Sequence, residues 1–131
     1  MDLPRRASLL LPLSLWGCSQ GRAPRSAAEA FIDRYYVERD HAKALEVAAE
    51  GAAERVRSEQ RLLAGGGGGR GPRVYYNLEK EQPRDEAVEL TYLLRIDAGG
   101  MKLKKQVVLR VRKLGEEFKV VALVEADLPT E

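Results

Sequence analysis

Val88-Glu89-Leu90-Thr91-Tyr92-Leu93-Leu94-Arg95-Ile96 stands in the second half of this 131-residue chain. Every second side chain, beginning with Val88, is apolar, whereas Glu89, Thr91 and Arg95 fill alternate positions. A period of two is typical of a β-strand with one face against a core and the other toward solvent. We therefore predict a half-buried strand here.

Three further segments carry the same period. Their apolar phases are Val74, Tyr76 and Leu78, then Val107, Leu109 and Val111, then Phe118, Val120, Ala122 and Val124. Turn sequences separate the segments at Pro83-Arg84-Asp85, Asp97-Ala98-Gly99-Gly100 and Gly115-Glu116-Glu117. Because short turns join antiparallel neighbours, we predict a four-stranded antiparallel meander. Its apolar face must be covered by another layer.

The covering layer comes from the first half of the chain. Ser26 and Glu29 have the spacing of a capping box, in which each side chain bonds the other's backbone amide. Ala28, Phe31, Ile32 and Tyr35 then recur at helical spacing. We predict a first helix from Ala27 to about Glu38.

Two more helices are predicted before the sheet. Asp40 is placed to cap a second helix that starts at His41 and stops near Gly51, although one continuous helix is the alternative. A third helix is expected from Ala52 to Leu63. A run of glycines, Gly65–Gly69, follows, and we predict a flexible loop over residues 65–71 because glycine leaves the backbone unrestrained.

The order of helices followed by a curved antiparallel sheet resembles nuclear transport factor 2-like, or cystatin-like, domains. Small bacterial lipoproteins with this domain are similar, with a Phe-x-x-x-Tyr pattern (Phe31, Tyr35) and an acidic residue (Asp40) before Lys43-Ala44-Leu45. The resemblance implies an α+β domain over residues 26–131. This fold hosts isomerases, dehydratases and non-enzymatic binding modules, and dimers form through the outer face of its sheet.

The N-terminal segment has the parts of an export signal. Arg5 and Arg6 provide a basic head, and an apolar run extends from Ala7 to Trp16. At about 1.5 Å per residue, this run covers roughly half of a bilayer's hydrocarbon core, too little for a transmembrane anchor. We therefore predict a signal peptide over residues 1–17.

Leu15, Gly17 and Cys18 resemble the cleavage signature of bacterial lipoproteins, from which Trp16 and the acidic Asp2 depart. The resemblance implies that Cys18 carries lipid, that residues 18–25 form a tether, and that the protein is membrane-anchored in the bacterial cell envelope, facing the periplasm or the outside. The alternatives are a disordered N-terminus with an inert thiol, a twin-arginine signal, or a soluble secreted product.

Composition excludes several classes of function. A formal net charge of +2 without a basic cluster of the required size gives no basis for nucleic-acid binding. One histidine and one cysteine do not suffice for a zinc site of three or four nitrogen and sulfur ligands. We predict neither metal nor cofactor.

The candidate site residues are few. We expect a candidate pocket formed by Tyr35, His41, Tyr76 and Tyr92, because the three tyrosines are placed to share the interior. His41 falls in the first turn of the second helix beside Asp40, where a capping neighbourhood is the simpler explanation. Buried tyrosines need a hydrogen-bond partner, so a structural role is the simpler alternative. Separately, Lys102, Lys104, Lys105, Arg110 and Arg112 gather on the last long hairpin, as a solvated face or as a contact for anionic lipid or an acidic partner.

These features favour a non-catalytic lipoprotein that binds an envelope protein or an apolar ligand. The alternative is a small isomerase or dehydratase that uses the hollow between helices and sheet. An enzyme of this kind needs an ionisable group in an open pocket, whereas a protein-binding module tolerates an interior filled by side chains.

Overall fold

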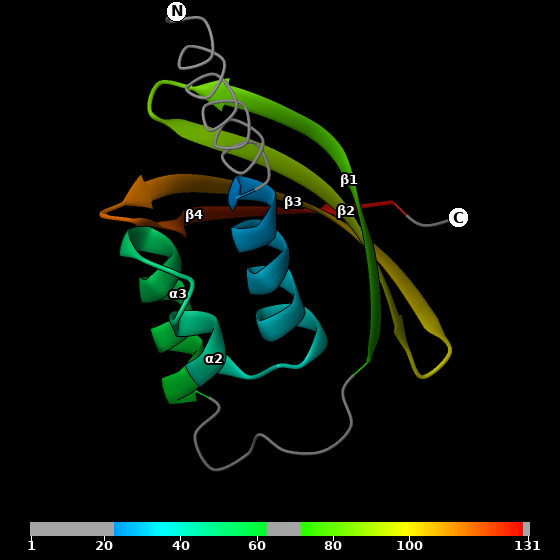
Figure 1. Ribbon diagram of the computed structural model, residues 1–131. Helices are drawn as coiled ribbons and strands as arrows, with labels where there is room; N and C mark the ends of the chain where they lie inside the picture. The colour runs from blue at the N-terminus through cyan, green and yellow to red at the C-terminus, as the bar shows by residue number, and fades with distance from the viewer. Residues whose placement is uncertain (1–22, 63–71, 130–131) are drawn as a thin grey trace, which may run out of the picture.

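The computed structural model describes residues 23–62 and 72–129, in which helices pack on one face of a curved sheet (Figure 1). The predicted signal peptide, Cys18 and the glycine run Gly65–Gly69 lie outside these described residues. Within the described ranges, every helix is too short or too polar to cross a bilayer.

The sheet is the predicted antiparallel meander, with the strands in the order β1-β2-β3-β4. The strands are β1 (Arg73–Arg84), β2 (Ala87–Ala98), β3 (Met101–Leu114) and β4 (Glu117–Leu128). The first turn lies at Asp85-Glu86, so Pro83 belongs to β1 instead of the turn. Proline is tolerated there because β1 is an edge strand. Gly99 and Gly100 form the β2–β3 turn, both with positive φ (56° and 90°), which favours glycine.

The predicted inner face is confirmed for the two central strands. Leu90, Tyr92, Leu94, Val107, Leu109 and Val111 are all buried against the helices. Cross-strand pairing keeps them together, because Leu90 lies opposite Leu109 and Tyr92 opposite Val107. Alternation along β2 and β3 therefore identified the core correctly.

In β4 the predicted phase is wrong beyond Val120. Val120 pairs with Val111, but Ala122 pairs with the preceding Arg110, so Val121 is an extra residue in a β-bulge. The bulge reverses which side chains face inward. Consequently Leu123 packs against the core, while Val124 is 62 % exposed.

The bulge also turns an acidic residue inward. Glu125 lies opposite Val107, a buried residue of the inner face, and thus points toward the helices. An unbulged β4 would have placed Val124 there and Glu125 on the solvent side.

The first helix differs from the prediction at its start. Residues 23–32 are α-helical, so Ser26 lies inside the helix and does not cap it, and residues 23–25, expected in the tether, are helical too. A π-helical turn, η1 (Asp33–Val37), continues the helix.

The predicted cap of the second helix is confirmed. The Asp40 carboxylate accepts a hydrogen bond from the Lys43 amide at 3.1 Å and starts α2 (His41–Leu45). However, α2 ends well before Gly51, which lies within α3 (Glu50–Leu62).

The connection between α2 and α3 covers the outer edge of β4. The Ala49 amide donates to the Val120 carbonyl at 2.8 Å, and the Val120 amide donates to the Val47 carbonyl at 2.9 Å. Ala48 thereby forms a parallel bridge with Val120. Backbone groups of an edge strand that would otherwise be unpaired are satisfied in this way.

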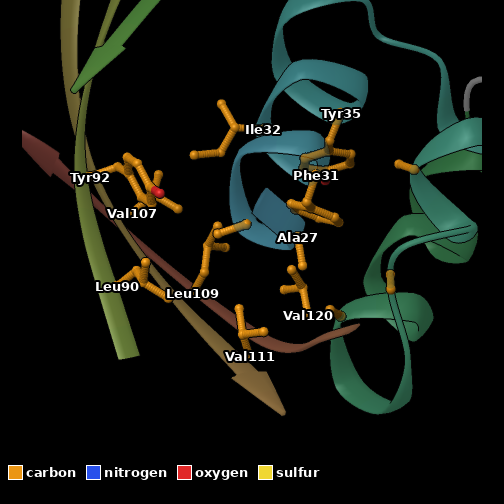
Figure 2. Packing of buried hydrophobic residues seen from close by; sticks show 14 of the residues in the cluster. Ala27, Phe31, Ile32, Tyr35, Leu90, Tyr92, Val107, Leu109, Val111 and Val120 are labelled. Carbon is orange, nitrogen blue, oxygen red and sulfur yellow. The ribbon is translucent and has the colours of Figure 1, made fainter. Parts of the chain in front are cut away.

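Side chains fill most of the space between the two layers (Figure 2). Phe31 and Ile32 of the first helix are completely buried against Leu90, Leu109 and the other inner residues of the sheet. The rings of Phe31 and Tyr35 stack at 5.1 Å. Open space is therefore confined to the ends of the interface.

Candidate functional site

One hollow of about 250 Å³ lies between the helices and the sheet, and we refer to it below as the hollow. Its helix-side wall consists of Tyr35, Tyr36, Arg39, His41, Arg55 and Glu59, and its sheet-side wall of Pro72, Val74, Ile96, Lys105 and Glu125. The volume is just below the roughly 300–1,000 Å³ that is usual for small-molecule sites.

Three elements place the polar residues of the helix-side wall. Tyr35 and Tyr36 belong to η1, His41 begins α2, and Arg55 and Glu59 are one turn apart on α3. Residues four apart on a helix share a face, so both α3 side chains point to the same side. Figure 1 shows these three elements meeting at the end of the domain where β1 begins.

Glu125 is the centre of the site's hydrogen bonding. Its carboxylate accepts from the Tyr36 hydroxyl, from Arg55 Nη2 at 2.9 Å, and pairs with Lys105 Nζ at 3.5 Å. Only 16 % of the Glu125 side chain is exposed. Burial alone would raise the pKa of Glu125, but the hydrogen bonds from Tyr36 and Arg55 outweigh it and hold the pKa below its ordinary value.

His41 is a largely enclosed ionisable group of the helix-side wall and has a carboxylate partner. Its Nε2 lies 3.4 Å from Glu59 Oε1, and only 13 % of the side chain is exposed. The edge of the Tyr35 ring contacts the imidazole, with 5.6 Å between the ring centroids. A carboxylate beside one ring nitrogen fixes the orientation of the imidazole.

The Tyr35 hydroxyl is buried and has no hydrogen-bond partner among the described residues. Burial, and then the neighbouring Glu59, raise the pKa of Tyr35 well above its ordinary value. A buried hydroxyl that lacks a hydrogen-bond partner destabilises the folded state by about 1–3 kcal/mol.

Of the four residues expected to share a pocket, two lie at the hollow and two lie elsewhere. Tyr35 and His41 line it, as described. Tyr76 donates instead to Asp33 at 2.9 Å and Tyr92 donates to Glu29 at 3.1 Å, so both hydroxyls are occupied by carboxylates of the first helix. These hydrogen bonds account for the two tyrosines without a role in ligand binding.

Sequence reasoning missed several residues of the hollow, namely Tyr36, Arg39, Arg55, Glu59 and Glu125, and assigned Lys105 to the hairpin cations instead. The spacing of Arg55 and Glu59 indicates a shared helix face but does not say which partner it meets. The orientation of Glu125 depends on the bulge at Val121, which the uninterrupted apolar run Val120–Val124 does not reveal.

The five cations of the last hairpin do not share one surface. Arg110 lies opposite Glu89 of β2. Lys105 contacts Glu125 and Asp127, and Arg112 pairs with Glu50. Lys102 and Lys104 instead line an outer depression of about 450 Å³ with Tyr75 and Arg95. In the described ranges, no group of three or more potential ligands could hold a metal ion.

Comparison with solved structures identifies the fold. A designed nuclear transport factor 2-like protein superposes on this chain with a TM-score of 0.62, at 11 % sequence identity, over 82 % of this chain and 99 % of the design. No protein-family model matches the sequence. No curated protein matches it either. The chain thus has a nuclear transport factor 2-like fold, as its order of helices and strands predicted.

Proposed function

We propose that this protein is a membrane-anchored lipoprotein whose domain binds a small molecule in the hollow without transforming it. The observation that carries the proposal is the hollow of about 250 Å³, in which ionisable side chains converge beside the apolar Val74 and Ile96. A second depression of about 590 Å³, beside Ala27 and Phe118, has carboxylates but no basic group among the described residues that line it. A pocket that combines apolar side chains with a few convergent polar groups is the usual place for a ligand.

The state of the charged groups favours binding over catalysis. Glu125 accepts hydrogen bonds from Tyr36 and Arg55 and forms an ion pair with Lys105. Glu59 lies beside both His41 and Arg55, with 4.0 Å between its Oε2 and Arg55 Nε. A general base must be free to take a proton from its substrate. Carboxylates engaged in this way instead give the wall a fixed shape.

The binding proposal can be tested by blocking the hollow. Val74 and Ile96 form its apolar wall, and Val74→Phe would add volume there. A library of small molecules is screened by amide chemical shifts of the full chain, and ligands that shift hollow residues are retested on the variant. We expect Val74→Phe to abolish binding while Val124→Phe, on the outer face, leaves it unchanged. Ligands that bind both variants equally would contradict the proposal.

Anchoring through Cys18 is supported by the sequence signature Leu15-Trp16-Gly17-Cys18. Two or three acyl chains hold a protein at a bilayer stably, because each buried methylene adds about 0.8 kcal/mol. Cells grown with labelled palmitate should label the protein, and Cys18→Ser should release it from the membrane fraction. A serine variant that sediments with membranes as before would contradict the anchoring proposal.

A second candidate function is general acid–base catalysis, such as an isomerase or dehydratase performs. The observation in its favour is the His41–Glu59 pair in the hollow, because a carboxylate-oriented imidazole can move protons. The test is deuterium exchange at the α-carbon of simple ketones in D₂O. Exchange that is accelerated by the protein and lost in both His41→Gln and Glu59→Gln would favour the enzyme over the binding module.

A further inference from the structure

The cations that line the hollow differ in whether they have an ionic partner. Among the described lining residues, Arg39, Arg55 and Lys105 are positively charged, whereas Glu59 and Glu125 are negatively charged. Asp127, just outside the lining, adds a third carboxylate beside Lys105. An anionic ligand would pair with a cation that these carboxylates leave without a partner.

One of the three cations has no such partner among the described residues. Arg55 donates to Glu125 at 2.9 Å, and Lys105 Nζ lies 3.5 Å from Glu125 and 3.3 Å from Asp127. Arg39, in contrast, is exposed and has no hydrogen bond or ion pair with any residue in the described ranges. Its guanidinium is therefore available to pair with an anionic group of a ligand.

The backbone holds Arg39 at a fixed corner of the hollow. Its φ of 56° lies in the left-handed region, between the end of η1 and the cap of α2. The next residue, Asp40, donates its amide to the Arg34 carbonyl at 2.8 Å and accepts from the Lys43 amide. The preceding residue, Glu38, donates its amide to the Asp33 carbonyl at 2.7 Å. These bonds on both sides limit how far the backbone of Arg39 can move from the site.

The opposite wall is suited to a hydrocarbon group. Val74 of β1 and Ile96 of β2 are cross-strand partners on the inner face, and Pro72 precedes them. A cationic ligand, in contrast, would find both carboxylates already engaged by Arg55, Lys105, Tyr36 and His41.

We infer that the hollow accepts a small organic carboxylate, whose anionic group pairs with Arg39 and whose hydrocarbon part lies on Val74 and Ile96. A guanidinium binds a carboxylate through two parallel hydrogen bonds, which fixes the orientation of the ligand. This inference rests on the proposed binding function and specifies the chemical class of its ligand.

The test compares three probes that share a six-carbon chain: hexanoate, hexanamide and hexylammonium. Each is titrated into the full chain while the amide shifts of hollow residues are followed. We expect hexanoate to bind about five- to tenfold more tightly than hexanamide, as a partly exposed charge-assisted hydrogen bond implies. Hexylammonium is expected to bind more weakly than either.

Two variants of Arg39 and one matched control complete the experiment. Arg39→Gln and Arg39→Gly should each lower hexanoate affinity about five- to tenfold and leave hexanamide unchanged. Glycine adopts a positive φ without steric cost, so the Arg39→Gly variant separates loss of charge from loss of fold. Arg57→Gln, which removes an exposed arginine of α3 outside the hollow, should change nothing.

Two results would overturn the inference and differ in what they say of the proposed function. If hexanamide or hexylammonium shifts hollow residues as strongly as hexanoate, or if Arg39→Gln leaves hexanoate binding unchanged, the ligand class is wrong and the binding function stands. If none of the three probes shifts these residues, the carboxylate inference is wrong and the proposed binding function loses its support as well.

Discussion

The carboxylate of Glu125 accepts a hydrogen bond from the Arg55 guanidinium at 2.9 Å, which joins β4 to α3 across 70 residues of sequence. Both side chains are partly enclosed, at 16 % and 35 % exposure. The same carboxylate accepts from Tyr36 of η1, so three elements meet on one group. We expect this group to contribute to stability as well as to the shape of the hollow.

Replacing Glu125 with glutamine tests that contribution. The variant keeps an acceptor for Tyr36 but leaves Arg55 and Lys105 without their ionised partner. We expect the free energy of unfolding to fall by about 1–2 kcal/mol, measured by urea denaturation. Glu116→Gln, in the exposed β3–β4 turn, is the control and should change stability by less than about 0.5 kcal/mol.

The lowered pKa of Glu125 predicts a dependence of stability on pH. Because the unfolded chain binds this proton more readily, the contribution of the carboxylate is complete above the ordinary pKa of 4.5 and is lost as the pH falls through the lower, folded-state value. The difference in stability between the wild type and Glu125→Gln should therefore shrink below about pH 4.5. Thermal unfolding at several pH values measures it, and a difference that persists unchanged at low pH would contradict this reasoning.

Phe31 tests the packing between the layers. It is completely buried, so Phe31→Ala should lower the free energy of unfolding by about 3–5 kcal/mol. Val37→Ala is the matched change at the end of the same helical segment, where the side chain is 40 % exposed, and should cost less than about 1 kcal/mol. Similar losses for the two variants in urea unfolding would show that the layers are not held together as described.

The outer face of the sheet offers a test of the self-association that we predict from the sequence. Val124 is 62 % exposed there and lies opposite Val108. If this face forms a dimer, Val124→Lys should shift the protein toward the monomer in light scattering, because it buries a charge in an apolar contact. Val37→Lys, on the helical side, should leave the molecular mass unchanged.

Much of the fold could be predicted because its signals are local. Turn sequences divided the second half into four strands, and alternation along β2 identified Leu90, Tyr92 and Leu94 as inner residues. Asp40 predicted the start of α2, because its side-chain oxygen can accept a hydrogen bond from an unpaired amide of the first helical turn. Each of these signals lies within a few residues of the feature that it predicts.

The phase of β4 could not be predicted, because residues 120–124 are apolar on both sides of the strand. Where every side chain is apolar, the sequence does not indicate which side chains face the core. Nothing in the sequence marks Val121 as the bulged residue either. The contact between Arg55 and Glu125 was missed for the same reason. Arg55 meets Glu125 only because the bulge turns that carboxylate inward.

The course of the first helix decides from which side a ligand would reach the protein. Figure 1 shows the described start of this helix, at residue 23, toward one end of the sheet, and its last turn toward the other end. Tyr35 and Tyr36 of that last turn line the hollow. A chain held at Cys18 has five residue steps before residue 23, which reach about 18 Å at full extension. If the proposed anchor at Cys18 is correct, the hollow would lie at the end of the domain that is remote from the anchored residue. Molecules dissolved in the aqueous compartment would then reach it more readily than molecules within the bilayer.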